Sequence, residues 1–267
     1  QVDMVIYSIA APRRTAPDGV TYKSVLKTTG EAYTNRTIDL RSNQLTEATI
    51  EPATQEEINN TIKVMGGEDW ILWIKALKDA GVLADGAKTV AYSYIGPELT
   101  YPIYKEGSIG QAKKDLYASA DKIQEEVDGV EAYVSVNKAV VTQSSAAIPI
   151  VPLYLAILFK VMKEQNVQEG CIEQMYRMIH DRLCNGGEVV TDENRLIRMD
   201  DWEMEPKVQE AVAAIWEKID QDNLEEVTDL EGYWQEFYEI FGFCIDGVDY
   251  SADVDADVQI PSIAPVE

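Results

Sequence analysis

The sequence predicts an α/β protein in which helices cover both faces of a parallel β-sheet. Three short apolar runs, at residues 2–9, 88–95 and 132–136, have the continuous hydrophobicity that is typical of strands buried in a parallel sheet. Segments with helical periodicity lie between these runs, and such alternation of strands and helices is the pattern of this fold class. From Pro152 onward helical periodicity dominates, so we expect additional helices in the C-terminal part.

The region between the first strand and the first helix is predicted to leave the sheet. Residues 20–53 alternate Thr, Val, Ile and Leu with polar residues, which indicates antiparallel strands. Thr54 and Glu57 then have the spacing of a capping box, in which each side chain satisfies a backbone N–H of the other residue. A helix is therefore expected from Thr54 to about Met65.

Two more helices are predicted before the third strand. One follows Glu68 and stops at Gly81, because glycine readily adopts the backbone conformation that ends a helix. Ser108 and Gln111 form a second capping-box pattern. We therefore expect Ser108 to be the N-cap of a helix that continues to about residue 127.

The C-terminal part is predicted to contain helices and an irregular tail. Pro206 suits the first turn of a helix, and apolar residues recur at helical spacing from Val208 to Ile219. Another helix is expected at about 228–241, and the Asp- and Pro-rich tail after Tyr250 is expected to be irregular.

The chain shows no internal repeat and no clear linker, so we expect residues 1–267 to form a single domain. Within it, residues 1–160 are expected to form the sheet-bearing catalytic part. Residues 161–267 are expected to form a mainly helical part that packs on it.

Composition narrows the range of functions. The hydrophobic content of 46% is ample for a core, and the net charge of −24, most of it in residues 201–267, would repel nucleic acid and anionic membranes. The most apolar stretch, residues 146–159, is too short and too interrupted by proline to span a membrane. The three cysteines form no Cys-x-x-Cys pair, which suits the reducing cytoplasm.

A phenol and an ammonium in one segment are the main candidates for chemistry. Eight residues separate Tyr104 from Lys113. A nearby cation stabilises phenolate and lowers the phenol's pKa, which favours proton transfer. Nine positions of a straight α-helix correspond to a rotation of about 900°, which puts the two side chains on opposite faces. They can therefore cooperate only if Tyr104 lies in the connection before the helix that carries Lys113. On spacing alone, a surface Tyr and a solvated Lys remain the alternative.

No metal site is expected. His180 is the only histidine, on a Met-rich helical face that predicts a packing or surface residue. Asp253, Asp255 and Asp257 imitate the start of a calcium loop, but Val258 stands where that loop requires glycine.

Eight blocks of the sequence carry a further signal. They are Val5–Arg14, Val64–Trp70, Ala91–Glu98, Tyr104–Lys113, Asn137–Gln143, Gly170–Gln174, Met199–Glu203 and Gly247–Tyr250. In this order, the blocks closely resemble the trans-2-enoyl-CoA reductase family, which includes the FabV-type enoyl-acyl-carrier-protein reductases. The resemblance implies an enlarged short-chain dehydrogenase/reductase fold, which is Rossmann-like, and NADH-dependent reduction of the 2,3 double bond of enoyl thioesters in fatty-acid biosynthesis.

The resemblance also implies roles for individual residues. Tyr104 matches the catalytic Tyr, and Lys113 matches the Lys that holds the cofactor ribose and biases the Tyr. Tyr94 would lie over the substrate thioester, and Phe159 and Tyr233 would line the acyl pocket. A phenol donor fits this reaction because negative charge builds on the thioester oxygen mainly in the transition state. The remaining cofactor contacts implied are Ile9 and Ala10 on the ribose side, and Val140, Val141 and Thr142 at the nicotinamide end.

One departure from the family concerns the phosphate loop. Relatives carry a glycine-rich turn whose backbone N–H groups hold the pyrophosphate, and no G-x-G-x-x-G occurs in this sequence. The resemblance begins at what would be the fourth strand of the family's sheet. We therefore expect the chain to be roughly the C-terminal two-thirds of a longer reductase, whose N-terminal segment completes the cofactor site.

Several alternatives remain open at this point. The substrate could be a CoA thioester or an acyl-carrier-protein thioester, and the acidic C-terminal quarter favours CoA slightly because carrier proteins are acidic. The chain could also be a non-catalytic module that binds acyl thioesters. A Tyr/Lys dehydrogenase that acts on alcohols is a third interpretation. Arg13 and Arg14 could contact phosphates of the CoA or carrier arm, or could be solvated.

Overall fold

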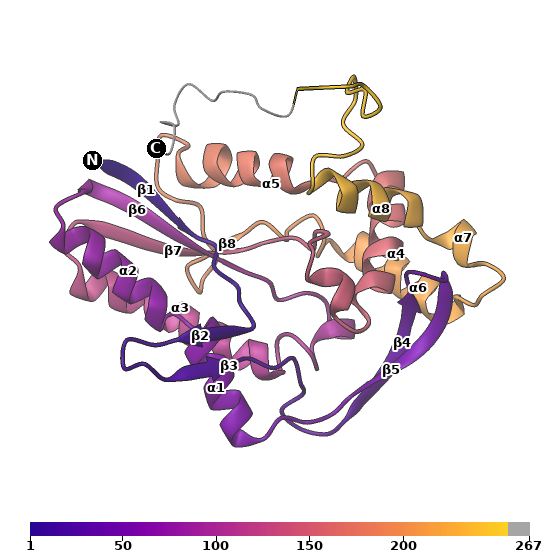
Figure 1. Cartoon of the computed structure of the whole chain (residues 1–267), viewed down its shortest axis with the longest axis horizontal. Coiled ribbons are helices and arrows are strands. Elements are labelled where there is room, and N and C mark those ends of the chain that lie inside the picture. Colours follow the sequence, from indigo (N-terminus) through magenta and orange to yellow (C-terminus); the bar gives the residue numbers. More distant parts are fainter. Residues whose placement is uncertain (256–267) are drawn as a thin grey trace.

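The computed structural model describes residues 1–255 and contains a four-stranded parallel sheet (Figure 1). The sheet has the order β1-β6-β7-β8, and each adjacent pair is parallel. Helices α2 and α3 cover one face, and α5 with the π-helical turn η3 covers the other. The predicted α/β class with additional C-terminal helices is confirmed. The strands are β1 (Val2–Tyr7), β6 (Leu83–Ser93), β7 (Val130–Val136) and β8 (Leu196–Arg198).

Strand β1 differs from its prediction. A fully buried strand was expected at residues 2–9, but β1 ends at Tyr7 and most of its side chains are partly or fully exposed. Val2 and Ile6 are 41% and 37% exposed. The expectation was wrong because β1 pairs only with β6 among the described residues and so lies at the edge of the sheet. Hydrophobicity alone does not distinguish a central strand from an edge strand.

Between β1 and β6 the chain forms two antiparallel hairpins and two helices. The two helices and the antiparallel strands within residues 20–53 were predicted, whereas the strand at Arg13–Thr15 was not. Thr54 and Glu57 form both hydrogen bonds of the capping box at the start of α1. The elements are β2 (Arg13–Thr15), β3 (Thr21–Lys23), β4 (Tyr33–Asp39), β5 (Gln44–Ile50), α1 (Gln55–Met65) and α2 (Glu68–Asp79).

The start of helix α3 (Ser108–Glu126) corrects the second capping prediction. Gly107 is the N-cap, and Ser108 is already helical. The Ser108 hydroxyl donates to the Val25 carbonyl at 2.6 Å and accepts the Lys27 N–H at 3.2 Å, so it is not free to cap the helix. Ser108 therefore ties α3 to the segment after β3. A sequence pattern does not reveal such a distant partner.

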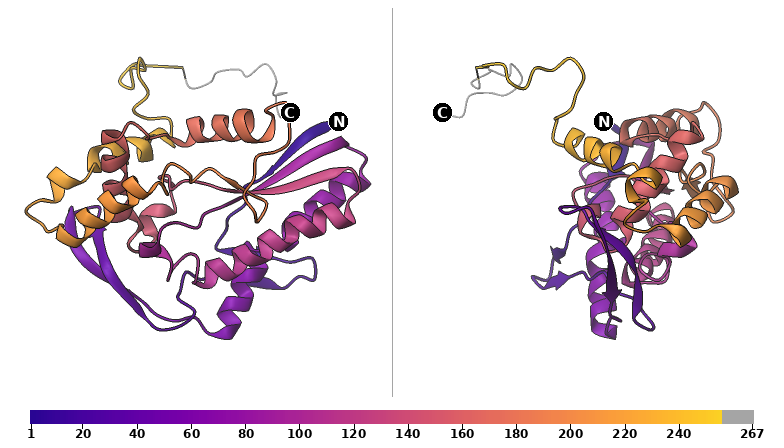
Figure 2. Two further views of the ribbon diagram at one scale, coloured as in Figure 1. Left: turned by 180° about the vertical axis from the view of Figure 1, so that it is seen from behind. Right: turned by 90° about the vertical axis from the view of Figure 1, so that its right-hand side faces the viewer.

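The C-terminal helices surround α4, whose side chains are almost all buried. Hairpin β4–β5 packs on one side of α4, and α6 and α8 pack on others. Residues 240–255 leave the end of α8 and extend away from the helices (Figure 2). The helices are α4 (Val151–Glu164), α5 (Cys171–Arg177), η3 (Met178–Leu183), α6 (Pro206–Lys218), α7 (Leu224–Val227) and α8 (Leu230–Glu239), with two short 3-10 turns, η1 (Glu98–Thr100) and η2 (Ser145–Ala147).

Within residues 1–255, no helix is long and apolar enough to cross a membrane. The most apolar helix, α4, is instead the centre of the larger hydrophobic core.

Candidate active site

The predicted site residues follow strands β1, β6 and β7 at the carboxyl edge of the sheet. Ile9 and Ala10 follow β1, Tyr94 follows β6, and Val140 lies four residues after the end of β7. Because the strands are parallel, their carboxyl ends meet at one edge, which is where ligands bind in open α/β sheets. This edge is the candidate active site.

A tight reversal of the chain after β6 brings two tyrosines together. Gly96 has a φ of 74°, a left-handed conformation that glycine adopts without strain. In the turn η1 that follows, the Thr100 carbonyl accepts the N–H of both Ile103 and Tyr104. As a result the Tyr104 ring packs edge-on against the Tyr94 ring, with ring centroids 4.9 Å apart.

Tyr104 lies in the connection before α3, as its spacing from Lys113 predicts. Its hydroxyl has no hydrogen-bond partner among residues 1–255, although the side chain is partly buried. Burial and then the negative charge of Glu203 raise the pKa of Tyr104. The expected lowering by a neighbouring cation is therefore absent in the described part of the chain, and the phenol is firmly protonated at neutral pH.

Lys113 approaches the end of β6 from α3. Its ammonium donates to the Tyr92 carbonyl at 3.0 Å. No carboxylate within the described residues forms an ion pair with it, and burial lowers the pKa of Lys113 to about 8. Tyr104 and Lys113 thus flank the end of β6 from two different elements, but they do not hydrogen-bond to each other in residues 1–255. An unpaired, desolvated ammonium in this position can bind a ligand's oxygen atoms.

Sequence reasoning missed Glu203, which lies beneath the two tyrosines. This carboxyl is fully buried and accepts hydrogen bonds from the Tyr94 hydroxyl at 3.1 Å, the Tyr154 hydroxyl at 2.6 Å and the Ala139 N–H at 2.7 Å. Burial raises the pKa of Glu203. The only signal in the sequence was its place in the Met199–Glu203 block.

Lys138 is a second buried charge that the sequence did not identify. It is 1% exposed, its ammonium donates to the Ala139 carbonyl at 2.8 Å, and it lies 5.2 Å from the centre of the Phe159 ring. Burial lowers the pKa of Lys138, while the charges of Glu203 and Glu236 oppose that shift. Lys138 therefore provides positive charge next to the Glu203 carboxylate.

The two residues expected at the acyl pocket are both fully buried. Phe159 lies in α4 under Lys138, and Tyr233 lies in α8. The Tyr233 hydroxyl is buried without a hydrogen-bond partner and faces Ser145 in η2. A buried hydroxyl without a partner is uncommon in folded proteins, and this one is fully enclosed beside the loop that follows β7.

The residues expected to contact the cofactor have different environments. Ile9 is 56% exposed, whereas Val141 is 5% exposed. Thr142 is exposed, but its hydroxyl accepts the Ser145 N–H at 3.0 Å and so closes the turn into η2. The loop after β7 is therefore held in a fixed shape next to Tyr233.

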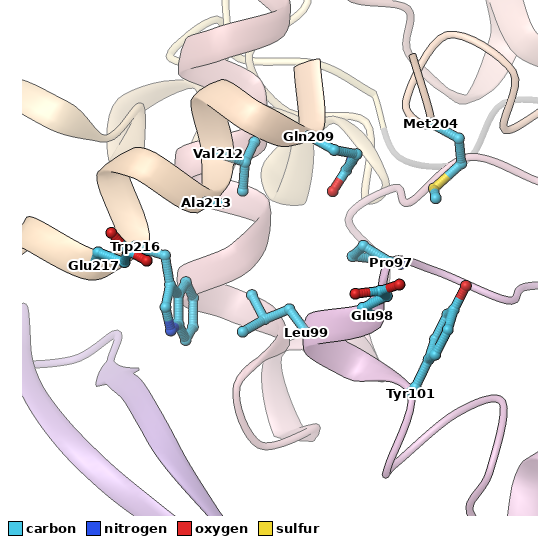
Figure 3. Close-up of a pocket in the computed structure, with 10 residues that line it drawn as sticks. All are labelled: Pro97, Glu98, Leu99, Tyr101, Met204, Gln209, Val212, Ala213, Trp216 and Glu217. Carbon is cyan, nitrogen blue, oxygen red and sulfur yellow. The ribbon is translucent and has the colours of Figure 1, made fainter. Parts of the chain in front are cut away.

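A cleft of about 460 Å³ opens between η1 and α6 (Figure 3). Trp216 and Leu99 approach each other at one end of the cleft, and Met204 lies at the opposite end. Gln209 connects the cleft to the buried network because its side-chain amide donates to the Glu203 carbonyl at 2.7 Å and to the Tyr154 hydroxyl at 3.2 Å. The lining residues are Pro97, Glu98, Leu99, Tyr101, Met204, Gln209, Val212, Ala213, Trp216 and Glu217.

Other sequence candidates have local structural partners. Arg14 pairs with Glu68 at 2.6 Å and Asp69 at 3.3 Å, so it is not free to bind phosphate. His180 is exposed and stacks on Tyr176. No group of metal-ligating side chains occurs in residues 1–255, and Asp257 of the calcium-like pattern lies outside the described residues.

The fold and the position of Tyr104 and Lys113 at the end of β6 define an α/β protein with a candidate ligand site at the carboxyl edge of its parallel sheet. The model of the family described as "Trans-2-enoyl-CoA reductase catalytic region" matches residues 1–184, and that described as "Enoyl reductase FAD binding domain" matches residues 191–254. The chain belongs to the trans-2-enoyl-CoA reductase family.

Individual relatives and a solved structure agree with this family assignment. The chain is 54% identical to the trans-2-enoyl-CoA reductase [NADH] of Ruminiclostridium cellulolyticum and 52% identical to the enoyl-[acyl-carrier-protein] reductase [NADH] of Cytophaga hutchinsonii. Each match covers 98% of this chain and 67% of the relative. The crystal structure of Treponema denticola trans-2-enoyl-CoA reductase in complex with NAD matches with a TM-score of 0.90 at 50% identity, over 94% of this chain and 64% of that chain. The chain thus spans about two thirds of the length of its relatives.

The residues matched by the second family model do not fit FAD. A flavin dinucleotide carries a pyrophosphate, which glycine-rich turns and positive charge bind. Residues 191–254 contain far more acidic than basic side chains and no glycine-rich turn of this kind. We therefore assign no step to FAD.

Proposed function

We propose that this chain carries the catalytic site for NADH-dependent reduction of the 2,3 double bond of trans-2-enoyl thioesters. The observation that carries the proposal is the Tyr104 hydroxyl, which is protonated and unpartnered among residues 1–255. Its ring packs edge-on against Tyr94, and the partly buried Lys113 approaches the end of the same strand, β6. The family and the NADH-dependent relatives support it.

Tyr104 would donate its hydrogen bond to the thioester oxygen, where negative charge builds as the double bond is reduced. An interaction that strengthens in the transition state lowers the barrier, whereas uniform binding does not. A phenol with a raised pKa suits this role because it keeps its proton until the charge develops. Tyr94 packs against the Tyr104 ring and so restricts the direction in which the hydroxyl points.

The described residues fit the nicotinamide and ribose half of NADH, which supplies the hydride when bound. The Lys113 ammonium would hold the ribose hydroxyls, since it has no carboxylate partner in residues 1–255. Ile9 and Ala10 on the ribose side and the loop 140–142 on the nicotinamide side would bound the ring.

The pyrophosphate half needs a further binding element. We propose that a segment bearing a glycine-rich turn pairs with the edge strand β1 and completes the cofactor site. The edge of β1 that is unpaired among residues 1–255, the exposed Val2 and Ile6, and the absence of G-x-G-x-x-G from this sequence support the proposal.

The decisive experiment follows NADH oxidation with crotonyl-CoA. It uses this chain alone and this chain fused behind the N-terminal third of the Ruminiclostridium cellulolyticum reductase. We expect reduction by the fusion and weaker activity, or none, by the chain alone. A fusion that is folded and binds NADH but does not reduce crotonyl-CoA would overturn the proposal. Ketone reduction in place of crotonyl-CoA reduction would indicate an alcohol dehydrogenase instead.

Among enoyl thioesters, we propose CoA thioesters as the main substrates. The strongly acidic C-terminal quarter, which would repel an acidic carrier protein, supports this choice. The relatives include proteins named for each substrate. Comparison of kcat/KM for crotonyl-CoA and crotonyl-carrier protein tests it, and a higher value for the carrier protein would reverse the choice.

A second candidate function is a non-catalytic module that binds acyl thioesters. The lack of a glycine-rich phosphate loop in this sequence favours it. Titration of NADH into the chain, monitored by nicotinamide fluorescence, tests the second candidate, which predicts no binding. Tight stoichiometric binding supports the reductase.

We also propose that the chain acts as one domain in the cytoplasm. Helix α4 packs against hairpin β4–β5 and against α6 and α8, which supports a shared core, and the three cysteines are exposed and unpaired, which suits a reducing compartment. A single cooperative unfolding transition tests the first proposal. Cell fractionation tests the second.

A further inference from the structure

Glu203 connects the two sides of the proposed site. Through its Oε1 atom it accepts the hydroxyl of Tyr94, the residue expected over the thioester, at 3.1 Å. Through its Oε2 atom it accepts the Ala139 N–H at 2.7 Å. Ala139 directly precedes the loop 140–142, which is expected at the nicotinamide end. One buried carboxyl therefore binds the substrate side and the cofactor side at once.

The groups around Glu203 require both of its carboxyl oxygens to accept hydrogen bonds. The Ala139 N–H can only donate, and the Tyr154 hydroxyl at 2.6 Å is short enough for a bond to an ionised carboxylate. The Gln209 amide donates to the Tyr154 hydroxyl and so occupies its acceptor position. That arrangement leaves Tyr154 to donate to Glu203. The nearby Lys138 ammonium favours the same charged form, while burial opposes it.

The bond to Glu203 also sets the direction of the Tyr94 hydroxyl. A phenol that donates its hydrogen to a buried carboxylate cannot donate it to the substrate. Tyr94 then serves as a fixed surface for Tyr104, whose ring lies edge-on at 4.9 Å. The donor role is thereby left to Tyr104, whose hydroxyl has no partner in residues 1–255.

We propose that Glu203 is a positioning residue for the reductase reaction. Its carboxylate fixes the Tyr94 ring against Tyr104 and, through Ala139, fixes the loop at the nicotinamide end, so that the proton donor and the hydride donor keep one relative position. This inference rests on the proposed function.

The test is a double-mutant cycle on the active fusion protein with crotonyl-CoA and NADH. In E203Q, the amide oxygen can still accept the Ala139 N–H, but the amide NH₂ then faces Tyr94 and reverses that hydrogen bond. We expect kcat to fall about 10- to 100-fold, as for misplaced catalytic groups. We expect KM for NADH to change less than threefold.

The cycle separates positioning from general destabilisation. Y94F keeps the ring but removes its bond to Glu203, and Y94F/E203Q should be no slower than the slower single variant, because both changes break one interaction. Additive losses in the double variant would overturn the proposal. So would a kcat of E203Q within twofold of the unmodified protein.

Two further variants serve as controls. E236Q changes another partly buried carboxyl, which accepts a hydrogen bond from Gln168 at 3.0 Å and forms none with Tyr94 or Tyr104 among residues 1–255. It should leave kcat within twofold. Y154F removes the shorter bond to Glu203 but retains the link to Tyr94. If Y154F lowers kcat as much as E203Q does, the effect is one of packing and the proposal fails.

The assay also distinguishes failure of this inference from failure of the proposed function. If the unmodified fusion binds NADH but does not reduce crotonyl-CoA, both the proposed function and the role of Glu203 are overturned. If the unmodified fusion is active and the E203Q variant has the same kcat, only the role of Glu203 is overturned. If E203Q does not fold, as judged by circular dichroism, the comparison of Y94F with Y154F decides, since only loss of the Tyr94 link should lower kcat.

Discussion

Two regions of the molecule bury positive charge, and they do so in opposite ways. Arg177, on the helical side of the sheet, binds Glu169 at 2.6 Å and Asp201 at 2.9 Å and stacks on Trp202. Burial alone would lower the pKa of Arg177, but these carboxylates raise it. Lys113 has no such partner in residues 1–255, and burial lowers its pKa to about 8.

The difference shows which charge stabilises the fold and which is available for a ligand. A buried ion pair with complete hydrogen bonds holds two segments together, and removal of one partner leaves an uncompensated charge. A desolvated ammonium without a counter-charge costs stability, and such groups concentrate at functional sites. By this criterion the Arg177 cluster is structural, whereas the end of β6 has the character expected of the proposed functional site.

The largest effect on the catalytic rate is expected in the proposed site at the end of β6. Tyr104→Phe removes the proposed donor but keeps the ring against Tyr94, so kcat/KM for crotonyl-CoA should fall on the order of 10²–10³-fold. The melting temperature should change little. Tyr133→Phe, in the middle of β7, is the matched control and should retain activity. Full activity of Tyr104→Phe would remove the phenol from the mechanism.

In the Arg177 cluster, a substitution is expected to lower the free energy of unfolding strongly and to change the catalytic rate little. Arg177→Met leaves Glu169, which is 4% exposed, without its counter-charge and should lower the free energy of unfolding by about 3–5 kcal/mol. Arg195→Met breaks an exposed pair with Asp121 and should cost less than about 1 kcal/mol. Urea denaturation measures both. Equal effects of the two variants would contradict the distinction.

Lys113 should destabilise the protein at neutral pH. Its folded pKa of about 8 lies below the ordinary value of 10.5, so the unfolded chain binds more protons between these values. Stability should therefore rise as pH increases from 8 to 10.5. Lys113→Met should remove this rise and stabilise the protein at pH 7 by about 1–3 kcal/mol, since one pKa unit corresponds to about 1.4 kcal/mol.

The exposed neighbour Lys114 provides the control for that experiment. Lys114→Met should leave the dependence of unfolding free energy on pH unchanged. A parallel loss of NADH affinity in Lys113→Met alone would link the unpaired charge to cofactor binding.

The smallest effect concerns the alkaline limit of activity. Burial and the charge of Glu203 both raise the pKa of Tyr104. Glu203→Gln removes the second cause, so the pKa of Tyr104 should fall. Because Lys113 loses its proton near pH 8, the decline of kcat that follows Tyr104 is the later of two. This later decline should begin at a lower pH in Glu203→Gln. The absence of a shift would show that Glu203 is uncharged in the folded protein.

Local signals predicted much of this architecture. The Thr54–Glu57 capping box, the proline at the start of α6 and the separation of Tyr104 from the helix of Lys113 depend on neighbours in the sequence, and the structure contains all three.

Features that depend on distant partners were not predictable in the same way. Ser108 binds a segment about 80 residues away, and Glu203 meets Tyr94 across 109 residues. The exposure of β1 depends on its place in the sheet, which a short apolar run does not specify. Whether Phe159 and Tyr233 line an acyl pocket stays a prediction.

The edge position of β1 has a practical consequence for anyone handling this polypeptide. Its outer row of backbone N–H and C=O groups is unpaired among residues 1–255, and Val2 and Ile6 are apolar side chains partly open to water. Such an edge is a template for strand addition between molecules. Concentrated samples should self-associate, and a lysine in place of Ile6 should keep them monomeric in light scattering.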